Sequence, residues 1–171
     1  KVYYHEEGNI ASVAVEPIQD GYIVVGAYSL NGVYAGFYVQ KIGNNGEYIW
    51  RKSLDESAAY YATFFGNALV KSKDANFLMV GHKGVSQLDN DFFLIKFNIN
   101  GDTIWKQTYQ TNNQEGSAQL INCFGGGYTI AGWTQQYYED QTFDPAKAYL
   151  IRIDEQGDTL WTSKFGTKGA N

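Results

Sequence analysis

Aromatic and acidic side chains gather in one stretch of the sequence, residues 133–146. Trp133 opens the stretch, and Tyr137, Tyr138 and Asp140 follow within the segment TQQYYEDQTFDPA. Aromatic faces stack on the C–H surfaces of sugar rings, while carboxylates and amides bind sugar hydroxyls. The stretch is therefore a candidate glycan platform. The alternative interpretation is that its rings cover the rim of a hydrophobic core.

Three further residues join these candidate ligand contacts. Tyr60 and Tyr61 lie in the segment DESAAYYATFF, which we expect on the same face of the molecule. His82 occupies the position that matches Trp133 in an earlier copy of the repeat described below. For all three, packing at the rim or in the core is the structural alternative.

Other residue constellations argue against catalysis and metal binding. His5 and His82 are the only histidines and lie far apart in the sequence, which disfavours a catalytic triad or a zinc site. No pair of carboxylates is spaced so as to face across a glycosidase pocket. The oxygen-bearing run 89–91 is too short for a calcium loop and predicts a turn. We therefore expect no catalytic residue, metal or cofactor in this chain.

Composition excludes further classes of partner. The 171 residues are 44% hydrophobic, which is enough for a packed core, and the formal net charge is −5. An acidic chain with scattered lysines is a poor ligand for nucleic acid or for an anionic membrane. No apolar run reaches the roughly 20 residues of a membrane span.

The candidate residues belong to a sequence repeated three times. Trp50, Trp105 and Trp161 are separated by 55 and 56 residues, since 105 − 50 = 55 and 161 − 105 = 56. Gly46, Gly101 and Gly157 keep the same spacing, and each copy also contains an upstream piece: GYIVVG, NFLMVG or GYTIAG. Self-similarity at such a period is typical of repeat architectures.

Each copy is predicted to form four short strands. In the first copy they are residues 12–18, 21–26, 37–42 and the segment around Trp50, and the equivalents of the first strand are NALVKS and AQLIN. Asn98 and Asp154 begin tight turns that close on a glycine, where a positive φ has no steric cost. The second-to-third and fourth-to-first connections vary among the copies. We expect binding there, because variable loops on a fixed scaffold usually carry function.

The repeated segments FYVQKIGNNGEYIW, FFLIKFNINGDTIW and AYLIRIDEQGDTLW, with the GYxxxG pieces, resemble the β-propeller repeats of secreted and cell-surface bacterial proteins, especially those of Bacteroidota. The resemblance covers essentially the whole chain. It implies an all-β fold of three four-stranded antiparallel blades from a partial β-propeller, and a location outside the cell or on the bacterial outer surface. YLIRIDEQGDTLW is also similar to the tryptophan-docking motif of quinoprotein propellers, which implies that Trp50, Trp105 and Trp161 pack between neighbouring blades.

This architecture divides the chain into four parts. Residues 1–9 are predicted to be the tail of a preceding blade, residues 10–64 the first blade, residues 65–115 the second, and residues 116–171 the third with the start of the next connection. Because propellers close with roughly four to eight blades, we expect further blades or a second copy to complete the ring. A β-trefoil, which also needs three four-stranded repeats, is the alternative fold.

Two classes of function remain open at this stage. The first is a non-catalytic binding or scaffolding segment of a surface propeller that holds a glycan or a protein on its variable loops. The second is part of a propeller enzyme whose active site lies in other blades. A purely structural role as a spacer in a large adhesin is a third possibility, which sequence cannot separate from the first.

Overall fold

The described part of the chain consists of β-strands and the turns and connections between them. The computed structural model describes residues 8–30, 33–55, 62–63, 68–86, 89–138, 140 and 142–166. These residues form thirteen strands and no helix, which confirms the predicted all-β class. The described part of the chain accordingly has no helix with the length and apolarity needed to cross a membrane.

The first sheet is a regular antiparallel meander. Its strands follow one another in chain order: β1 (Gly8–Ile18), β2 (Gly21–Leu30), β3 (Val33–Gly43) and β4 (Tyr48–Asp55). Alternation of apolar and polar side chains along these strands gives each sheet two distinct faces.

The second sheet repeats this order with a divided first strand. It contains β5 (Ala62–Thr63), β6 (Leu69–Lys71), β7 (Phe77–Ser86), β8 (Asp89–Phe97) and β9 (Thr103–Tyr109). Both β5 and β6 pair with β7, so a single strand at NALVKS was an incomplete prediction. Residues 89–91, predicted as a turn, instead begin β8.

The third sheet is again a four-stranded antiparallel meander. Its strands are β10 (Gln114–Asn122), β11 (Tyr128–Gln135), β12 (Lys147–Ile153) and β13 (Thr159–Phe165). One parallel pair, Gln114 with Asn90, links β10 to β8, so the second and third meanders are connected into one nine-stranded sheet; we refer to its two halves as the second and third sheets. The described sheets do not close on themselves, as the barrel of a β-trefoil would require.

The predicted glycine turns are confirmed. Asn98 Oδ1 accepts hydrogen bonds from the backbone N–H groups of Asn100 and Asp102, both at 2.9 Å. Asp154 makes the same two bonds in the third sheet. Gly101 and Gly157 have φ angles of 77° and 92°, which favour glycine over any residue with a Cβ.

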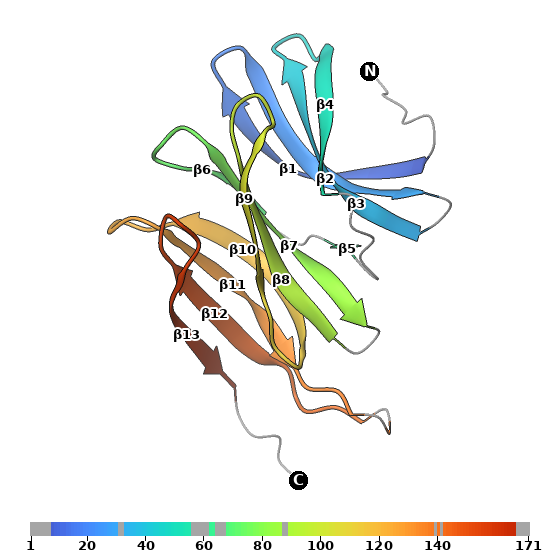
Figure 1. Cartoon of the computed structure of the whole chain (residues 1–171), viewed down its shortest axis with the longest axis vertical. Helices are drawn as coiled ribbons and strands as arrows, with labels where there is room; N and C mark the ends of the chain where they lie inside the picture. The colour runs from blue at the N-terminus through green and yellow to red at the C-terminus, as the bar shows by residue number, and fades with distance from the viewer. Residues whose placement is uncertain are drawn as a thin grey trace.

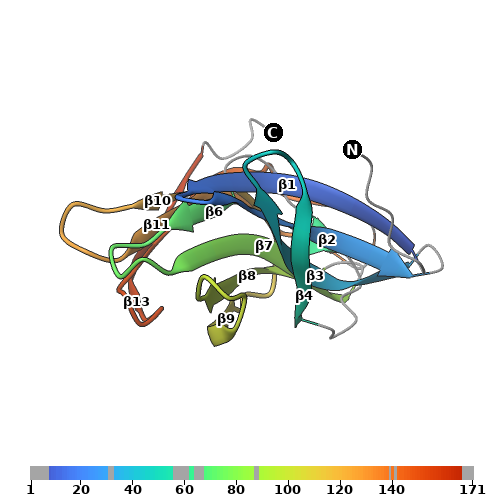
Figure 2. The same ribbon diagram turned by 90° about the horizontal axis from the view of Figure 1, so that it is seen from above.

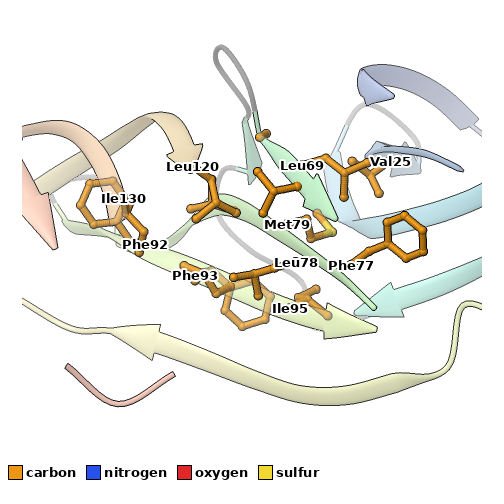
Figure 3. Packing of buried hydrophobic residues seen from close by; sticks show 14 of the residues in the cluster. Val25, Leu69, Phe77, Leu78, Met79, Phe92, Phe93, Ile95, Leu120 and Ile130 are labelled. Carbon is orange, nitrogen blue, oxygen red and sulfur yellow. The ribbon is translucent and has the colours of Figure 1, made fainter. Parts of the chain in front are cut away.

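The three sheets stack face to face along the molecule (Figures 1 and 2). Phe37 of the first sheet stacks on Phe93 of the second, with ring centroids 5.6 Å apart. Phe92, on the opposite face of the second sheet, lies 5.7 Å from Tyr149 of the third. Figure 3 shows the resulting core, in which side chains of the second sheet meet Val25 on one side and Ile130 on the other.

We call the face of each sheet that points toward the next sheet along the chain its forward face, and the opposite face its rear face. One cross-strand row on the forward face has the same register in all three sheets: Ile23–Lys41–Trp50, Leu78–Lys96–Trp105 and Thr129–Arg152–Trp161. Each row ends in a cation beside a tryptophan. The repeat in the sequence is therefore also a repeat of pairing register.

The tryptophans of the first two rows lie against the turn glycines of the following sheet. A Cβ added to Gly101 would lie 2.9 Å from the Trp50 ring, and one added to Gly157 would lie 3.1 Å from the Trp105 ring. The absence of a Cβ therefore lets each indole approach the next sheet closely. Trp161, in the third row, is about half exposed.

Candidate functional site

A polar cleft of about 150 Å³ lies at the end of the third sheet where β11 runs into β12. Figure 1 shows that the β11–β12 connection leaves the sheet at the end opposite the β12–β13 turn. The cleft is lined by side chains from this connection, from the β9–β10 connection and from the neighbouring strand ends: Asn113, Thr134, Gln136, Asp144, Pro145, Lys147 and Lys164. It thus lies among the variable connections, where the sequence predicted binding.

Local hydrogen bonds hold the β11–β12 connection in shape. The Gln135 side chain donates to the Asp144 carbonyl at 2.8 Å, and the Asp144 N–H donates to the Gln136 carbonyl at 3.0 Å. Farther out, Tyr137 and Phe143 form a β-bridge and place their ring centroids 5.3 Å apart. The wall of the cleft is therefore a small hairpin-like structure with its own contacts.

A buried carboxyl group lies directly behind the cleft. Glu115 Oε1 accepts hydrogen bonds from the hydroxyls of Thr111 at 2.6 Å and Thr134 at 2.8 Å. Glu115 is 1% exposed, and its other oxygen, Oε2, has no hydrogen-bond partner. Thr134 therefore links this buried acid to the surface of the cleft, and Asn113 is tied to the same network because its N–H donates to the Thr111 hydroxyl.

Burial controls the protonation of this network. It raises the pKa of Glu115 to about 7; the two threonine hydroxyls lower this pKa and the nearby Asp91 raises it. Burial also raises the pKa of Asp91, which accepts a hydrogen bond from the Thr111 N–H at 2.8 Å. Proximity of two buried carboxyl groups favours the protonated form of one of them near neutral pH.

The cleft surface combines donors and acceptors of both charges. Lys164 lies over the Tyr149 ring, with Nζ 4.8 Å from the centroid, and Lys147 adds a second ammonium group. Asp144 contributes a carboxylate, and Asn113 and Gln136 contribute amides. Such a set can bind hydroxyl and carboxylate groups of a ligand. Among the residues that the structure describes, no group of three or more His, Cys, Asp or Glu side chains could hold a metal ion.

The structure separates the predicted platform residues. Trp133 and Thr134 are neighbours on β11, but strand alternation points Thr134 to the cleft and Trp133 to the forward face, where its indole covers Gly116. Tyr137 stacks on Phe143, and Tyr138 is exposed. Asp140 accepts hydrogen bonds from the Thr142 N–H and hydroxyl, and so stabilises a turn.

The remaining candidates do not line the cleft. His82 is 6% exposed on the forward face of the second sheet, and burial lowers its pKa to about 4. Tyr60 and Tyr61 lie outside the described residues. Gly46 has a φ of 73° in the first glycine turn, where an added Cβ would meet open space.

Sequence analysis missed most of the cleft. Glu115 pairs with Thr134 across β10 and β11, at the register where the first sheet pairs Ile10 with Tyr28. An acid in place of an apolar residue inside a repeat is a signal, but it appears only once the strands are aligned by register. No protein-family model matches the chain, and no curated protein matches it.

Proposed function

We propose that the chain is a non-catalytic binding segment of a secreted or surface β-propeller, and that it holds one sugar residue of a glycan in the cleft of the third sheet. The observation that carries this proposal is the cleft itself: seven polar or small side chains converge at the variable end of the scaffold. Its floor is fixed by a hydrogen bond from the Thr134 hydroxyl to the buried Glu115.

The propeller assignment has two supports. Each sheet is an antiparallel meander of four strand positions in chain order, as a propeller blade is. Successive sheets also stack with a tryptophan against the next turn glycine, at Trp50–Gly101 and Trp105–Gly157. The same contact repeated at the same register is the expected geometry of blades arranged around an axis.

The chemistry of the cleft favours a hydroxylated ligand. A volume of about 150 Å³ is smaller than the roughly 300–1,000 Å³ of pockets for drug-sized ligands, so it suits one sugar ring. Ammonium, carboxylate and amide groups supply donors and acceptors on several sides. Two lysines, Lys147 and Lys164, further favour a sugar that carries a carboxylate. The Tyr138 ring is exposed, and its hydroxyl interacts with Asp144 of the cleft, so this ring could contact the rest of a glycan chain.

The buried carboxyl group has a positioning role in this proposal. A pKa of about 7 would suit Glu115 for proton transfer. However, Glu115 is not among the residues that line the cleft, and its bonded oxygen is directed at two threonine hydroxyls. We therefore assign Glu115 to holding Thr134 in place, and propose no reaction.

A glycan array followed by calorimetry tests the proposal. The purified chain is expected to bind a subset of acidic or hydroxyl-rich glycans. Gln136→Ala and Asn113→Ala should each weaken that binding about tenfold, the equivalent of one lost hydrogen bond. Gln107→Ala, an exposed glutamine on β9 away from the cleft, is the matched control and should bind as the parent does.

Two results would overturn the proposal. One is an array on which the folded chain binds no glycan. The other is binding that Gln136→Ala and Asn113→Ala leave intact, which would place the ligand elsewhere. With a blank array, a protein that the parent chain captures and the two cleft variants do not would replace the glycan by a protein ligand.

A further inference from the structure

The chain makes one kind of sheet-to-sheet junction twice. In both junctions the forward face of one sheet meets the rear face of the next, and a forward tryptophan contacts a turn glycine. At the second junction the Tyr109 hydroxyl also donates to the Gly157 carbonyl at 2.7 Å. Both junctions therefore have the same direction along the chain.

The forward face of the third sheet is the same surface without a neighbour among the described residues. Trp161 and Phe165 hold the positions of Trp105 and Tyr109, since they pair with Arg152 and Ala148 as those pair with Lys96 and Phe92. Phe165 is 56% exposed, whereas Tyr109 is 8% exposed. Exposed Ile121 and Trp133 lie on this face as well.

The rear face of the first sheet is the complementary surface. Tyr22 holds the register position of Phe77 and Tyr128, because the three residues pair with Ile42, Phe97 and Ile153, which occupy matching positions near the end of the third strand of each sheet. Tyr22 is 41% exposed, while Phe77 and Tyr128 are 0% and 1% exposed. Val15, opposite Val24 in the same face, is also exposed, although its equivalents Leu69 and Leu120 are buried.

We propose that the forward face of the third sheet binds the rear face of the first sheet of a second copy of this chain, head to tail. The two faces are the unmatched halves of a junction that the chain already forms twice, and each displays apolar side chains of the kind that mark interaction sites. Opposite faces meet at both existing junctions, which favours head-to-tail association over contact between two third sheets. Such a heterologous contact closes into a ring or extends into a filament.

The charge on the third sheet does not oppose this contact. Arg152, in the forward row, donates hydrogen bonds to the backbone carbonyls of Gly126, Tyr128 and Ile153. Its guanidinium is therefore satisfied by its own sheet, and no acidic partner is needed across the new junction. Trp161, next in the row, supplies the large aromatic surface that commonly dominates association energy.

Sedimentation of the full chain over a dilution series measures the association. The parent chain is expected to form particles of two or more copies that dissociate on dilution. Trp161→Glu should raise the dissociation constant about thirtyfold or more, as loss of an aromatic anchor does. Phe124→Glu, which changes a fully exposed ring in the β10–β11 turn, is the matched control and should associate as the parent does. If Trp161→Glu lowers the denaturation midpoint, Phe165→Glu replaces it as the variant that disrupts the forward face of the third sheet.

Mixing variants tests the head-to-tail arrangement. Tyr22→Glu alone should weaken association, because it alters the rear face. A mixture of Trp161→Glu and Tyr22→Glu should form a dimer of one copy of each, since one unaltered face remains on each chain. A parent chain that stays monomeric at every concentration overturns the proposal, and so does association that Tyr22→Glu leaves unchanged while Trp161→Glu abolishes it.

Discussion

The second and third sheets share one sequence pattern and differ in what surrounds them. In β8 the seven residues from Asp91 to Phe97 are all buried. In β12 burial alternates along the strand, with Tyr149, Ile151 and Ile153 buried and their neighbours less so. The second sheet has a neighbour on both faces, whereas the third has one only on its rear face among the described residues. Burial in this repeat is thus set by the neighbouring sheets rather than by the strand itself.

Leucine at one register position measures this difference most directly. Leu94 and Leu150 occupy matching positions, but Leu94 is fully buried and Leu150 only partly. Leu94→Ala should lower the free energy of unfolding by about 2–5 kcal/mol, and Leu150→Ala by about 1 kcal/mol or less. Urea denaturation of the two variants measures both values, in samples dilute enough that the chain is monomeric and the forward face of the third sheet is uncovered. Equal losses would show that the third sheet is covered on both faces in solution.

The glycine turns allow a similar comparison, between a turn glycine that contacts a tryptophan and a turn glycine that does not. Gly101→Ala places a Cβ 2.9 Å from the Trp50 ring, whereas Gly46→Ala places one in open space. Both substitutions strain a positive φ, at about 1 kcal/mol. Repacking of the indole should bring the loss at Gly101 to about 2–3 kcal/mol. Denaturation midpoints of the two variants measure the two losses. Similar losses would show that the contact between the Trp50 indole and Gly101 does not contribute to the stability of the junction.

The third sheet also differs from the first in its buried acid. Because the folded-state pKa of Glu115 is raised from 4.5 to about 7, the folded state binds the proton more tightly than the unfolded state. Stability should therefore fall as pH rises from about 4.5 to 7 and stay reduced above that range.

Glu115→Gln removes this titration and keeps an oxygen for the two threonine hydroxyls. It should be nearly neutral at pH 4.5 and stabilise the fold by on the order of 2 kcal/mol at pH 8. Denaturation of both proteins at the two pH values measures the difference. A stability difference that does not change with pH would mean that Glu115 has the same pKa in the folded and unfolded states, and would contradict the raised pKa.

Sequence predicted the fold best where residue type alone determines geometry. The all-β class and the turns that begin at Asn98 and Asp154 were predicted from residue type and spacing, and both are confirmed. The division between β5 and β6 was missed. It falls where the first strands of the other two sheets carry a bulge, at Ser12/Ala14 and Ser117/Gln119. The bulge depends on pairing across the sheet, which the spacing of residues does not reveal.

The candidate site was predicted by location and missed by residue. Variable connections marked the end of the sheet at which the cleft lies, and the cleft includes Gln136 and Asp144 from the longest of them. The sequence predicted ligand contacts at the aromatic residues of that stretch. Strand alternation instead points Trp133 away from the cleft, and its neighbour Thr134 lines the cleft. A shift of one residue changes the face, so register had to be known before the site could be assembled.

Two polar contacts across the junctions complete the comparison at the smallest scale. The Tyr109 hydroxyl is buried and donates to the Gly157 carbonyl, so Tyr109→Phe should lower the free energy of unfolding by about 1 kcal/mol. Lys52 forms an exposed ion pair with Asp102 at 2.5 Å, and Lys52→Met should give no resolvable change, because water screens exposed pairs. Denaturation in low and high salt checks both expectations. A salt-dependent loss for Lys52→Met would show that the first junction relies on charge where the second relies on a buried hydrogen bond.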